Sequence, residues 1–197
     1  MTSKDITIVI TTYKSEEKIE NCLNSINSEI KVIIVENSNN VKFKTKIEKL
    51  FPNVECVLTK ENLGYGRANN IGLKMVQSKY SLILNPDTIL DKEAINNFFN
   101  FIKINENFAI LGPTQNENLL GVEDSKNIHT NFFEAESVKG FAMFLNMVKF
   151  NNIGFFDENF FLYLEEIDLC KRIKQINEKI FINENIKIFH YGGKSVD

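Results

Sequence analysis

Tryptophan is absent from this chain of 197 residues, and cysteine is scarce, with three residues. Cys22, Cys56 and Cys170 are an odd number, widely spaced and without a CxxC pair. A disulfide framework or a structural zinc site needs paired or closely spaced cysteines. We therefore expect three reduced thiols in the core.

Long apolar runs and a basic excess are also missing. No run approaches the roughly 20 apolar residues of a membrane-spanning helix, and Met1 is followed by polar residues rather than by a signal peptide. The 23 Lys and Arg residues stand against 26 Asp and Glu, a net charge of −3, so nucleic-acid binding is not expected. These absences predict a cytoplasmic protein, with a peripheral position at the inner face of the membrane left open.

Length and composition predict one domain over residues 1–197. A chain of this length is long enough for one sizeable core and short for two. Hydrophobic residues make up 43% of the chain, and its 17 Phe residues predict an aromatic core. No internal repeat or low-complexity linker divides the sequence.

The first half of the chain alternates β-branched runs with amphipathic segments. Apolar runs at residues 6–10, 32–35, 54–58 and 80–84 are typical of strands buried on both faces. Apolar residues at helical spacing between these runs predict crossover helices. The alternation favours an α/β fold with a mostly parallel, doubly wound sheet.

The second half is less regular, and we expect its strands to be mixed in direction. A helix is expected around residues 95–102, and strands at 138–145, 179–182 and 186–190. From Pro113 to Ser137 no periodicity is visible, and we expect this segment to be a mobile loop that contacts substrate.

Three carboxylates crowd into four positions at Glu165, Glu166 and Asp168, after an aromatic run and at the expected start of a helix. Like-charge repulsion makes such a cluster unfavourable unless a helix N-terminus, a metal ion or a polar ligand offsets it. A solvated first helical turn explains most such clusters that stand alone. A second acidic feature, Asn85-Pro86-Asp87, follows a buried strand and favours metal-assisted transfer chemistry on a phosphorylated donor.

Polar residues follow each expected strand of the first half. Ligands bind at the carboxyl edge of an open parallel sheet, because side chains and helix N-termini converge there. Each group alone is more simply explained as a strand end, a turn or a cap. Four groups at matching ends favour a binding site, and they are Thr11-Thr12-Tyr13, Glu36-Asn37, Glu61-Asn62 and Asn85-Pro86-Asp87.

The glycine-containing segment at residues 62–70 is not a phosphate-binding motif. It matches neither GxGxxG nor GxxxxGK[ST], and no glycine loop follows the first strand. A dinucleotide-dependent oxidoreductase and a P-loop enzyme are therefore not expected, and a sugar nucleotidyltransferase is disfavoured for the same reason. Arg67 in this segment could reach a diphosphate or form a surface ion pair.

Six motifs occur in order along the chain: TTY, VENS, ENLGYGRANN, LILNPD, GFFDENFFLYLEEIDLCKR and IFHYGG. From Ile6 to Gly193 the sequence resembles glycosyltransferase family 2, and within it the bacterial rhamnosyltransferase-like branch. The resemblance implies a GT-A fold, with a nucleotide-sugar-binding half at about 1–112 and an acceptor and catalytic half at about 113–197. It also implies an inverting transfer assisted by Mg²⁺ or Mn²⁺.

The acidic cluster takes its roles from this resemblance. Glu166 matches the general base, although the family usually has Asp there, and the extra methylene adds roughly 1.5 Å of reach. An acceptor hydroxyl needs such a carboxylate to take its proton. Glu165 and Asp168 would position the acceptor, or structure the helix through Lys171 and Arg172.

The metal and donor sites follow in the same way. Asp87 matches the last acid of the family's DxD signature, whose first position is Asn85 here, and His190 matches a position that often supplies another metal ligand. Glu36 stands where the family usually has an Asp that contacts the base. The expected donor-binding residues are Thr11, Thr12, Tyr13, Glu36, Asn37, Asn62, Arg67, Asn69, Asn85, Asp87 and Gly140.

The expected reaction moves a sugar from a dTDP- or UDP-sugar, with dTDP-rhamnose slightly favoured, to a hydroxyl of a glycan or lipid-linked acceptor. The alternative is a nucleotide-sugar-binding module without independent transfer, because family members usually continue with further C-terminal helices. Such a module would bind the donor, hydrolyse it slowly, or act only with a partner subunit. Phe132-Phe133 could contact a lipid-linked acceptor, but burial in the core or at an oligomer interface is the simpler expectation.

Overall fold

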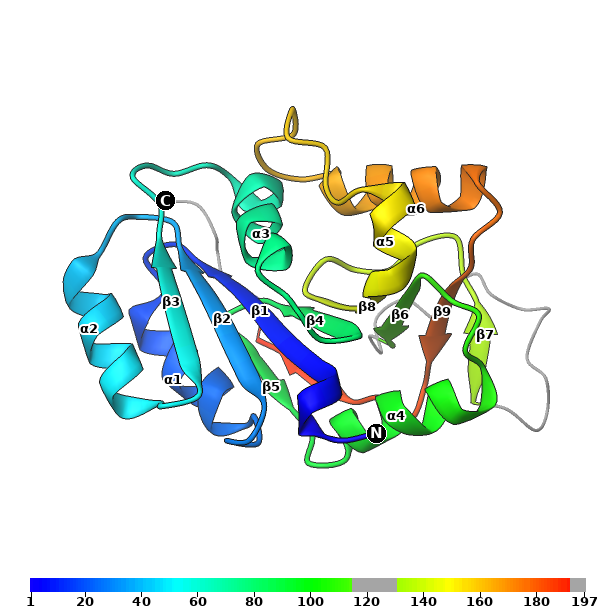
Figure 1. The fold of residues 1–197 in the computed structure, drawn as a ribbon, viewed down its shortest axis with the longest axis horizontal. Helices are drawn as coiled ribbons and strands as arrows, with labels where there is room; N and C mark the ends of the chain where they lie inside the picture. Colours follow the sequence, from blue (N-terminus) through cyan, green and yellow to red (C-terminus); the bar gives the residue numbers. More distant parts are fainter. Residues whose placement is uncertain (115–130, 192–197) are drawn as a thin grey trace.

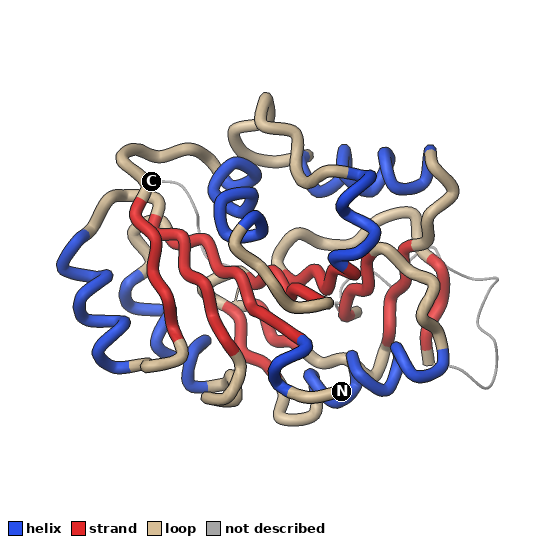
Figure 2. Tube along the Cα trace, in the orientation of Figure 1, coloured by secondary structure: helices blue, strands red, loops and turns tan. Residues whose placement is uncertain are grey.

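An eight-stranded sheet lies between two layers of helices in the computed structural model, which describes residues 1–114 and 131–191 (Figure 1). Figure 2 shows the strands passing between the two helical layers. The strands are β1 (Ile6–Thr12), β2 (Lys31–Glu36), β3 (Val54–Leu58), β4 (Tyr80–Leu84), β5 (Thr88–Leu90), β6 (Ile110–Pro113), β7 (Phe132–Glu134), β8 (Ala142–Asn146), β9 (Ile180–Asn183) and β10 (Ile188–His190). The helices are α1 (Glu16–Asn24), α2 (Val41–Leu50), α3 (Tyr65–Lys74), α4 (Ala94–Ile104), α5 (Met147–Ile153) and α6 (Glu165–Gln175), after a short 3-10 turn at Ser3–Asp5.

The strand order is β3-β2-β1-β4-β8-β6-β9-β7. Strands β1 to β4 are parallel, β8 runs antiparallel between β4 and β6, β9 is parallel to β6, and β7 is antiparallel to β9. A separate antiparallel pair joins β5 to β10. The prediction of a mostly parallel sheet that becomes mixed in its second half is therefore confirmed.

Each face of the sheet carries its own apolar core, because the β-branched residues of the strands point alternately to the two sides. In β1, Ile8 and Ile10 pack with α1, α2 and α4, whereas Val9 packs with α3, α5 and α6. Aromatic residues fill much of the first core, where Phe98 and Phe144 stack with ring centroids 4.5 Å apart. Cys22, Cys56 and Cys170 are buried free thiols, as predicted.

The second half departs from the prediction in several places. Strand β8 begins at Ala142 rather than at 138, because the chain turns at residues 139–142. The carbonyl groups of Gly140 and Phe141 there accept hydrogen bonds from Tyr65 and Asn85 and not from a neighbouring strand. Helix α5 was not predicted. Strand β6 ends at the first residue of the segment 113–137 that was expected to be an irregular loop, and β7 lies within that segment, so the expectation is wrong for residues 132–134. Residues 115–130 of the segment lie outside the described residues.

Phe133 is buried and Phe132 packs edge-on against Phe101, with ring centroids 4.9 Å apart. The structure therefore favours the expectation that Phe132 and Phe133 pack in the core. In the described part of the chain, every helix is too short or too polar to span a bilayer.

Candidate active site

The turn after β4 brings Asn85 and Asp87 together with a residue more than a hundred positions later. The turn leads into β5, and because β5 pairs with β10, His190 comes to lie opposite Thr88. His190 Nε2 lies 3.2 Å from Asp87 Oδ1 and 3.4 Å from Asn85 Nδ2. The structure thus places the two sequence-predicted metal ligands side by side.

Asp87 is largely buried, and Lys18 Nζ lies 3.9 Å from its Oδ2 atom. Burial by itself raises the pKa of the Asp87 carboxyl, but the hydrogen bond and charge of His190, together with Lys18, outweigh burial and leave the pKa lowered. The carboxylate is therefore held in its ionised form, which is the form that binds cations.

The side-chain oxygen of Asp87 and the ring nitrogen of His190 are suitable ligand atoms for a divalent metal ion. Neighbouring ligands of an octahedral ion at about 2.1 Å lie about 3.0 Å apart, close to the spacing of Asp87 Oδ1 and His190 Nε2. Within residues 1–114 and 131–191, no group of three or more His, Cys, Asp or Glu side chains has the geometry of a metal site. An ion held here would need further oxygens from a ligand or from water, as Mg²⁺ commonly does.

The turn after β2 is organised by Glu36. This buried carboxylate accepts hydrogen bonds from Ser38 N at 3.1 Å, Ser38 Oγ at 2.5 Å and Asn40 N at 2.6 Å. These bonds occupy both oxygens of Glu36 and cap the turn. The structure therefore shows the local, turn-capping use of Glu36, and any contact with a base would be made in addition to these bonds.

Asn37 and Asn62, which sequence reasoning placed at neighbouring strand ends, meet directly. Asn37 Nδ2 donates to Asn62 Oδ1 at 2.9 Å, while Asn37 Oδ1 accepts from Leu63 N at 3.0 Å and from Thr59 Oγ1 at 3.2 Å. Asn62 Oδ1 also accepts from Gly64 N at 3.0 Å. The two side chains fix the backbone of the loop that leads into α3.

The end of β1 offers polar groups with no protein partner. The hydroxyl oxygens of Thr11 and Thr12 are buried and have no hydrogen-bond partner among the described residues. The Thr12 carbonyl accepts from Asn37 N at 2.7 Å, which joins this end to the turn after β2. Tyr13, the third predicted residue, is exposed. Because buried polar groups are normally satisfied, these two hydroxyls could donate a hydrogen bond to a ligand or accept one from it.

Helix α3 begins against the segment that precedes α6. Gly64 has φ +78°, and a Cβ atom at this position would overlap the carbonyl oxygen of Phe161. That oxygen accepts a hydrogen bond from Tyr65 N at 3.0 Å. Asn69 is buried with its Oδ1 atom unpartnered among the described residues, whereas Arg67 is half-exposed and lies 3.8 Å from Glu158. For Arg67 the structure thus shows the surface ion pair.

The acidic cluster forms the first turn of α6, as predicted. Glu165 is 4% exposed, and its Oε2 atom has no hydrogen-bond partner in the described chain. Burial, with the nearby charge of Glu166, raises the pKa of Glu165. Asp168 pairs with Arg172 at 2.8 Å, and Arg172 also donates to the carbonyl of Phe155 at 2.6 Å. Of the two roles considered for Asp168, the structure shows the structural one.

Glu166 extends over Gly140, and a Cβ atom at Gly140 would lie 3.7 Å from the Cβ, Cγ and Cδ atoms of Glu166. Gly140 is in turn held by Tyr65, whose hydroxyl donates to its carbonyl oxygen at 2.6 Å. Next in sequence, Phe141 stacks on His190, with ring centroids 4.8 Å apart. Sequence reasoning missed Tyr65 and Phe141, because aromatic residues beside apolar ones indicate core packing and give no sign of partners far along the chain.

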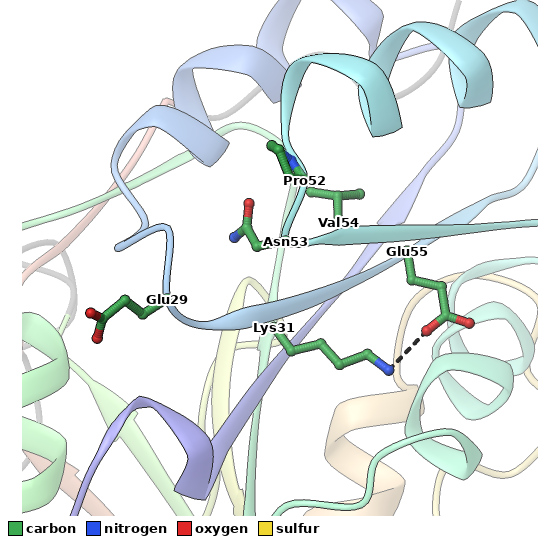
Figure 3. A pocket seen from close by; sticks show the side chains of 6 residues that line it. All are labelled: Glu29, Lys31, Pro52, Asn53, Val54 and Glu55. Carbon is green, nitrogen blue, oxygen red and sulfur yellow. Dashed lines mark ion pairs between the residues drawn. The ribbon is translucent and has the colours of Figure 1, made fainter.

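A hollow of about 370 Å³ lies at the opposite edge of the sheet, where β2 and β3 begin. Figure 3 shows its lining, across which Lys31 and Glu55 form an ion pair of 2.8 Å. The site residues described above gather at the carboxyl edge and contribute nothing to this hollow.

Several known proteins resemble this chain in sequence or in fold. The family model described as Glycosyl transferase family 2 matches residues 7–170. The chain is 26% identical to the low-salt glycan biosynthesis hexosyltransferase Agl10 of Haloferax volcanii, over 89% of this chain and 64% of that protein. It is 21% identical to the rhamnosyltransferase WbbL of Escherichia coli K12, over 93% of this chain and 82% of that protein.

Two solved structures share the fold. The mannosyltransferase PcManGT of Pyrobaculum calidifontis, in complex with GDP-Man and Mn²⁺, superimposes with a TM-score of 0.81 at 14% identity, over 97% of this chain and 58% of that one. S. aureus TarS 1–349 in complex with UDP-GlcNAc gives a TM-score of 0.75 at 19% identity, over 98% and 59%. The fold is therefore GT-A. The chain spans about 60% of the length of each of these two solved structures.

Proposed function

The chain belongs to glycosyltransferase family 2, and from that premise we propose that it transfers a sugar from a nucleotide-sugar donor to a hydroxyl group of a glycan or lipid-linked acceptor. The observation that carries this proposal is the convergence of two acidic centres. His190, which pairs with Asp87, stacks on Phe141, and the side chain of Glu166 lies over the adjacent Gly140.

Glu166 acts as the general base in this proposal. Its carboxylate takes the proton of the acceptor hydroxyl while that oxygen forms a bond to the anomeric carbon of the donor. The bond from the anomeric carbon to the diphosphate breaks in the same displacement, and its electron pair leaves with the nucleoside diphosphate. A single displacement inverts the anomeric centre, so one base suffices and no covalent intermediate is needed.

Asp87 and His190 would hold a divalent ion, Mg²⁺ or Mn²⁺, which when bound neutralises the charge of the departing diphosphate. The matched spacing of their ligand atoms and the ionised state of Asp87 support this assignment. The Mn²⁺ in the complex of the mannosyltransferase supports it by analogy.

The unpartnered oxygens line the proposed donor site. The hydroxyls of Thr11 and Thr12 and the Asn69 amide oxygen lack partners within the described residues, and a nucleotide sugar offers hydroxyl and N–H groups that can bind them. We propose a dTDP- or UDP-sugar as the donor, with dTDP-rhamnose as the first candidate. The likeness to a rhamnosyltransferase supports this choice.

A second candidate function is donor binding without independent transfer. It is favoured by the exposed apolar side chains of residues 161–164, directly before the acidic turn of α6. A surface of this kind is commonly covered by a partner, so transfer would then require a second component.

Calorimetric titration tests the proposed function. The wild type and Asp87→Ala are titrated with a panel of dTDP-, UDP- and GDP-sugars, each with and without Mn²⁺. Metal-dependent binding of one nucleotide class, lost in Asp87→Ala, supports a donor site at this edge. Absence of binding to every donor would refute both candidate functions, whereas binding without turnover on any acceptor would favour the second.

A further inference from the structure

Gly140 and Phe141 lie where the chain enters β8, and together they contact three parts of the proposed active site. These parts are the start of α3, the acidic turn of α6, and the pair Asp87 and His190. The four residues that follow, Ala142–Leu145 of β8, are apolar core residues buried between the two helical layers. Gly140 and Phe141, by contrast, make hydrogen-bond and stacking contacts to residues of the proposed site, and core packing does not account for these contacts.

Gly140 joins α3 to the proposed base. Its carbonyl oxygen accepts the hydrogen bond from Tyr65 at 2.6 Å, and its Cα side faces the aliphatic part of Glu166. Burial raises the pKa of the Tyr65 phenol, and the charges of Glu165 and Glu166 raise it further. The hydroxyl therefore keeps its proton and remains a donor to Gly140 at every working pH.

Phe141 joins the other acidic centre. Its ring lies flat on the imidazole of His190, with centroids 4.8 Å apart and planes inclined by 9°. Its carbonyl oxygen accepts a hydrogen bond from Asn85 N at 2.8 Å. One residue thus fixes the ring plane of His190 and the backbone of the turn that carries Asp87.

We propose that Gly140–Phe141 is a positioning hub, in which the Tyr65 hydroxyl sets the place of Glu166 through Gly140 and the Phe141 ring sets the orientation of His190. The inference rests on the proposed function, because it concerns how the base Glu166 is held in place relative to the proposed metal ligands Asp87 and His190. Tyr65 and Phe141 are positioning residues, because each acts through a neighbour.

The first arm of the test removes one hydroxyl group. Tyr65→Phe keeps the ring, including its edge-on contact with Phe156, but leaves Gly140 without its donor. We expect kcat to fall about tenfold, while the donor Kd changes less than twofold, because the base moves and the donor site does not. Tyr80→Phe is the matched control, since Tyr80 is a buried core tyrosine stacked on Phe144 and distant from this hub.

The second arm reads metal affinity rather than activity. Phe141→Leu removes the stacked ring, and we expect the affinity for Mn²⁺, measured by electron paramagnetic resonance in the presence of the nucleoside diphosphate, to weaken about tenfold. Phe141→Tyr keeps the ring and should retain wild-type affinity. Saturating Mn²⁺ should restore most of the kcat of Phe141→Leu, whereas it should not restore that of Tyr65→Phe.

The hub is refuted if Tyr65→Phe behaves like Tyr80→Phe, or if Phe141→Leu binds Mn²⁺ as the wild type does. An equal loss of donor affinity and kcat in Tyr65→Phe also contradicts it, since that pattern marks general disruption. These outcomes are distinct from failure of the proposed function, in which the wild type itself would neither bind donor nor transfer sugar.

Discussion

The turn after β2 and the segment before α6 both border the proposed active site, but they hold their polar groups in opposite ways. In the turn, the Glu36 carboxylate is filled by hydrogen bonds from Ser38 and Asn40. Directly after the segment, at the start of α6, Glu165 is buried with an oxygen that has no partner in the described chain. The chain itself therefore satisfies the carboxylate in the first region but leaves one carboxylate oxygen in the second without a partner among the described residues.

Both regions contain left-handed residues, but in the turn this residue is Asn39, with φ of +60°, a residue type that tolerates the conformation. Tyr163 and Leu164 adopt left-handed conformations, with φ of +70° and +73°. The four side chains of residues 161–164 are exposed by 58%, 40%, 63% and 62%. In Figure 1 this segment, in gold, stands out beyond α3 and α6. Each left-handed bulky residue costs about 1–2 kcal/mol, so the segment stores strain of the kind found at functional sites.

The largest expected effect concerns the turn after β2. Glu36→Ala removes the acceptor for the amides of Ser38 and Asn40 and should cost about 2–4 kcal/mol, or about 5–12 °C in Tm by thermal unfolding. The control Glu55→Ala deletes an exposed ion pair with Lys31 and should leave Tm within about 2 °C. A loss of similar size in both variants would mean that the turn is not held by Glu36.

The next prediction concerns the contact between the α3 start and the segment. In Gly64→Ala the new methyl group meets the Phe161 carbonyl in addition to an unfavourable φ, and we expect a loss of about 2–4 kcal/mol. Gly154→Ala is the matched control, because Gly154 has a similar φ of +72° but no atom within 4 Å of its added Cβ, so about 1 kcal/mol is expected. Equal destabilisation in urea unfolding would show that strain alone matters.

Glu165→Gln should stabilise the protein at neutral pH. The pKa of Glu165 is raised above 4.5 in the folded state, so ionising this carboxyl destabilises the folded protein. The wild type therefore loses stability as the pH rises from 4.5 through the folded-state pKa. The variant does not titrate, so its advantage over the wild type should grow above pH 4.5, to about 1 kcal/mol or about 2–4 °C in Tm. An advantage that is independent of pH would contradict this account.

The smallest effect is expected from relieving strain. Leu164→Asn places a residue that tolerates the left-handed conformation and is favoured at a helix N-cap, so stability should rise by about 0.5–1 kcal/mol. Chemical unfolding measures the change. A decrease would mean that the exposed Leu164 side chain contributes packing that offsets the strain.

The parallel part of the fold was predictable because continuous β-branched runs mark its strands, and Val54–Leu58 and Tyr80–Leu84 occur as expected. Strand β6 was missed, since Leu111-Gly112-Pro113 is typical of a turn and becomes a strand by pairing with β8 and β9. Tertiary pairing overrode local preference there.

The site was predictable to the level of which loops meet, because carboxyl ends of parallel strands share one edge of the sheet. The partner of each side chain was not. Arg67 pairs with Glu158 and Tyr65 with Gly140, contacts across 91 and 75 positions that no periodicity encodes. These distant partners decide whether a polar residue faces a ligand or holds a loop.

The central claim is that Asp87 and Glu166 serve one site with separate tasks. The most direct test measures donor Kd and single-turnover transfer rate side by side for Asp87→Asn and Glu166→Gln. We predict that Asp87→Asn weakens metal-dependent donor binding at least tenfold, and that Glu166→Gln keeps donor Kd within about twofold while the transfer rate falls at least a hundredfold. Transfer by Glu166→Gln at the wild-type rate, or undiminished metal-dependent binding by Asp87→Asn, would contradict the account.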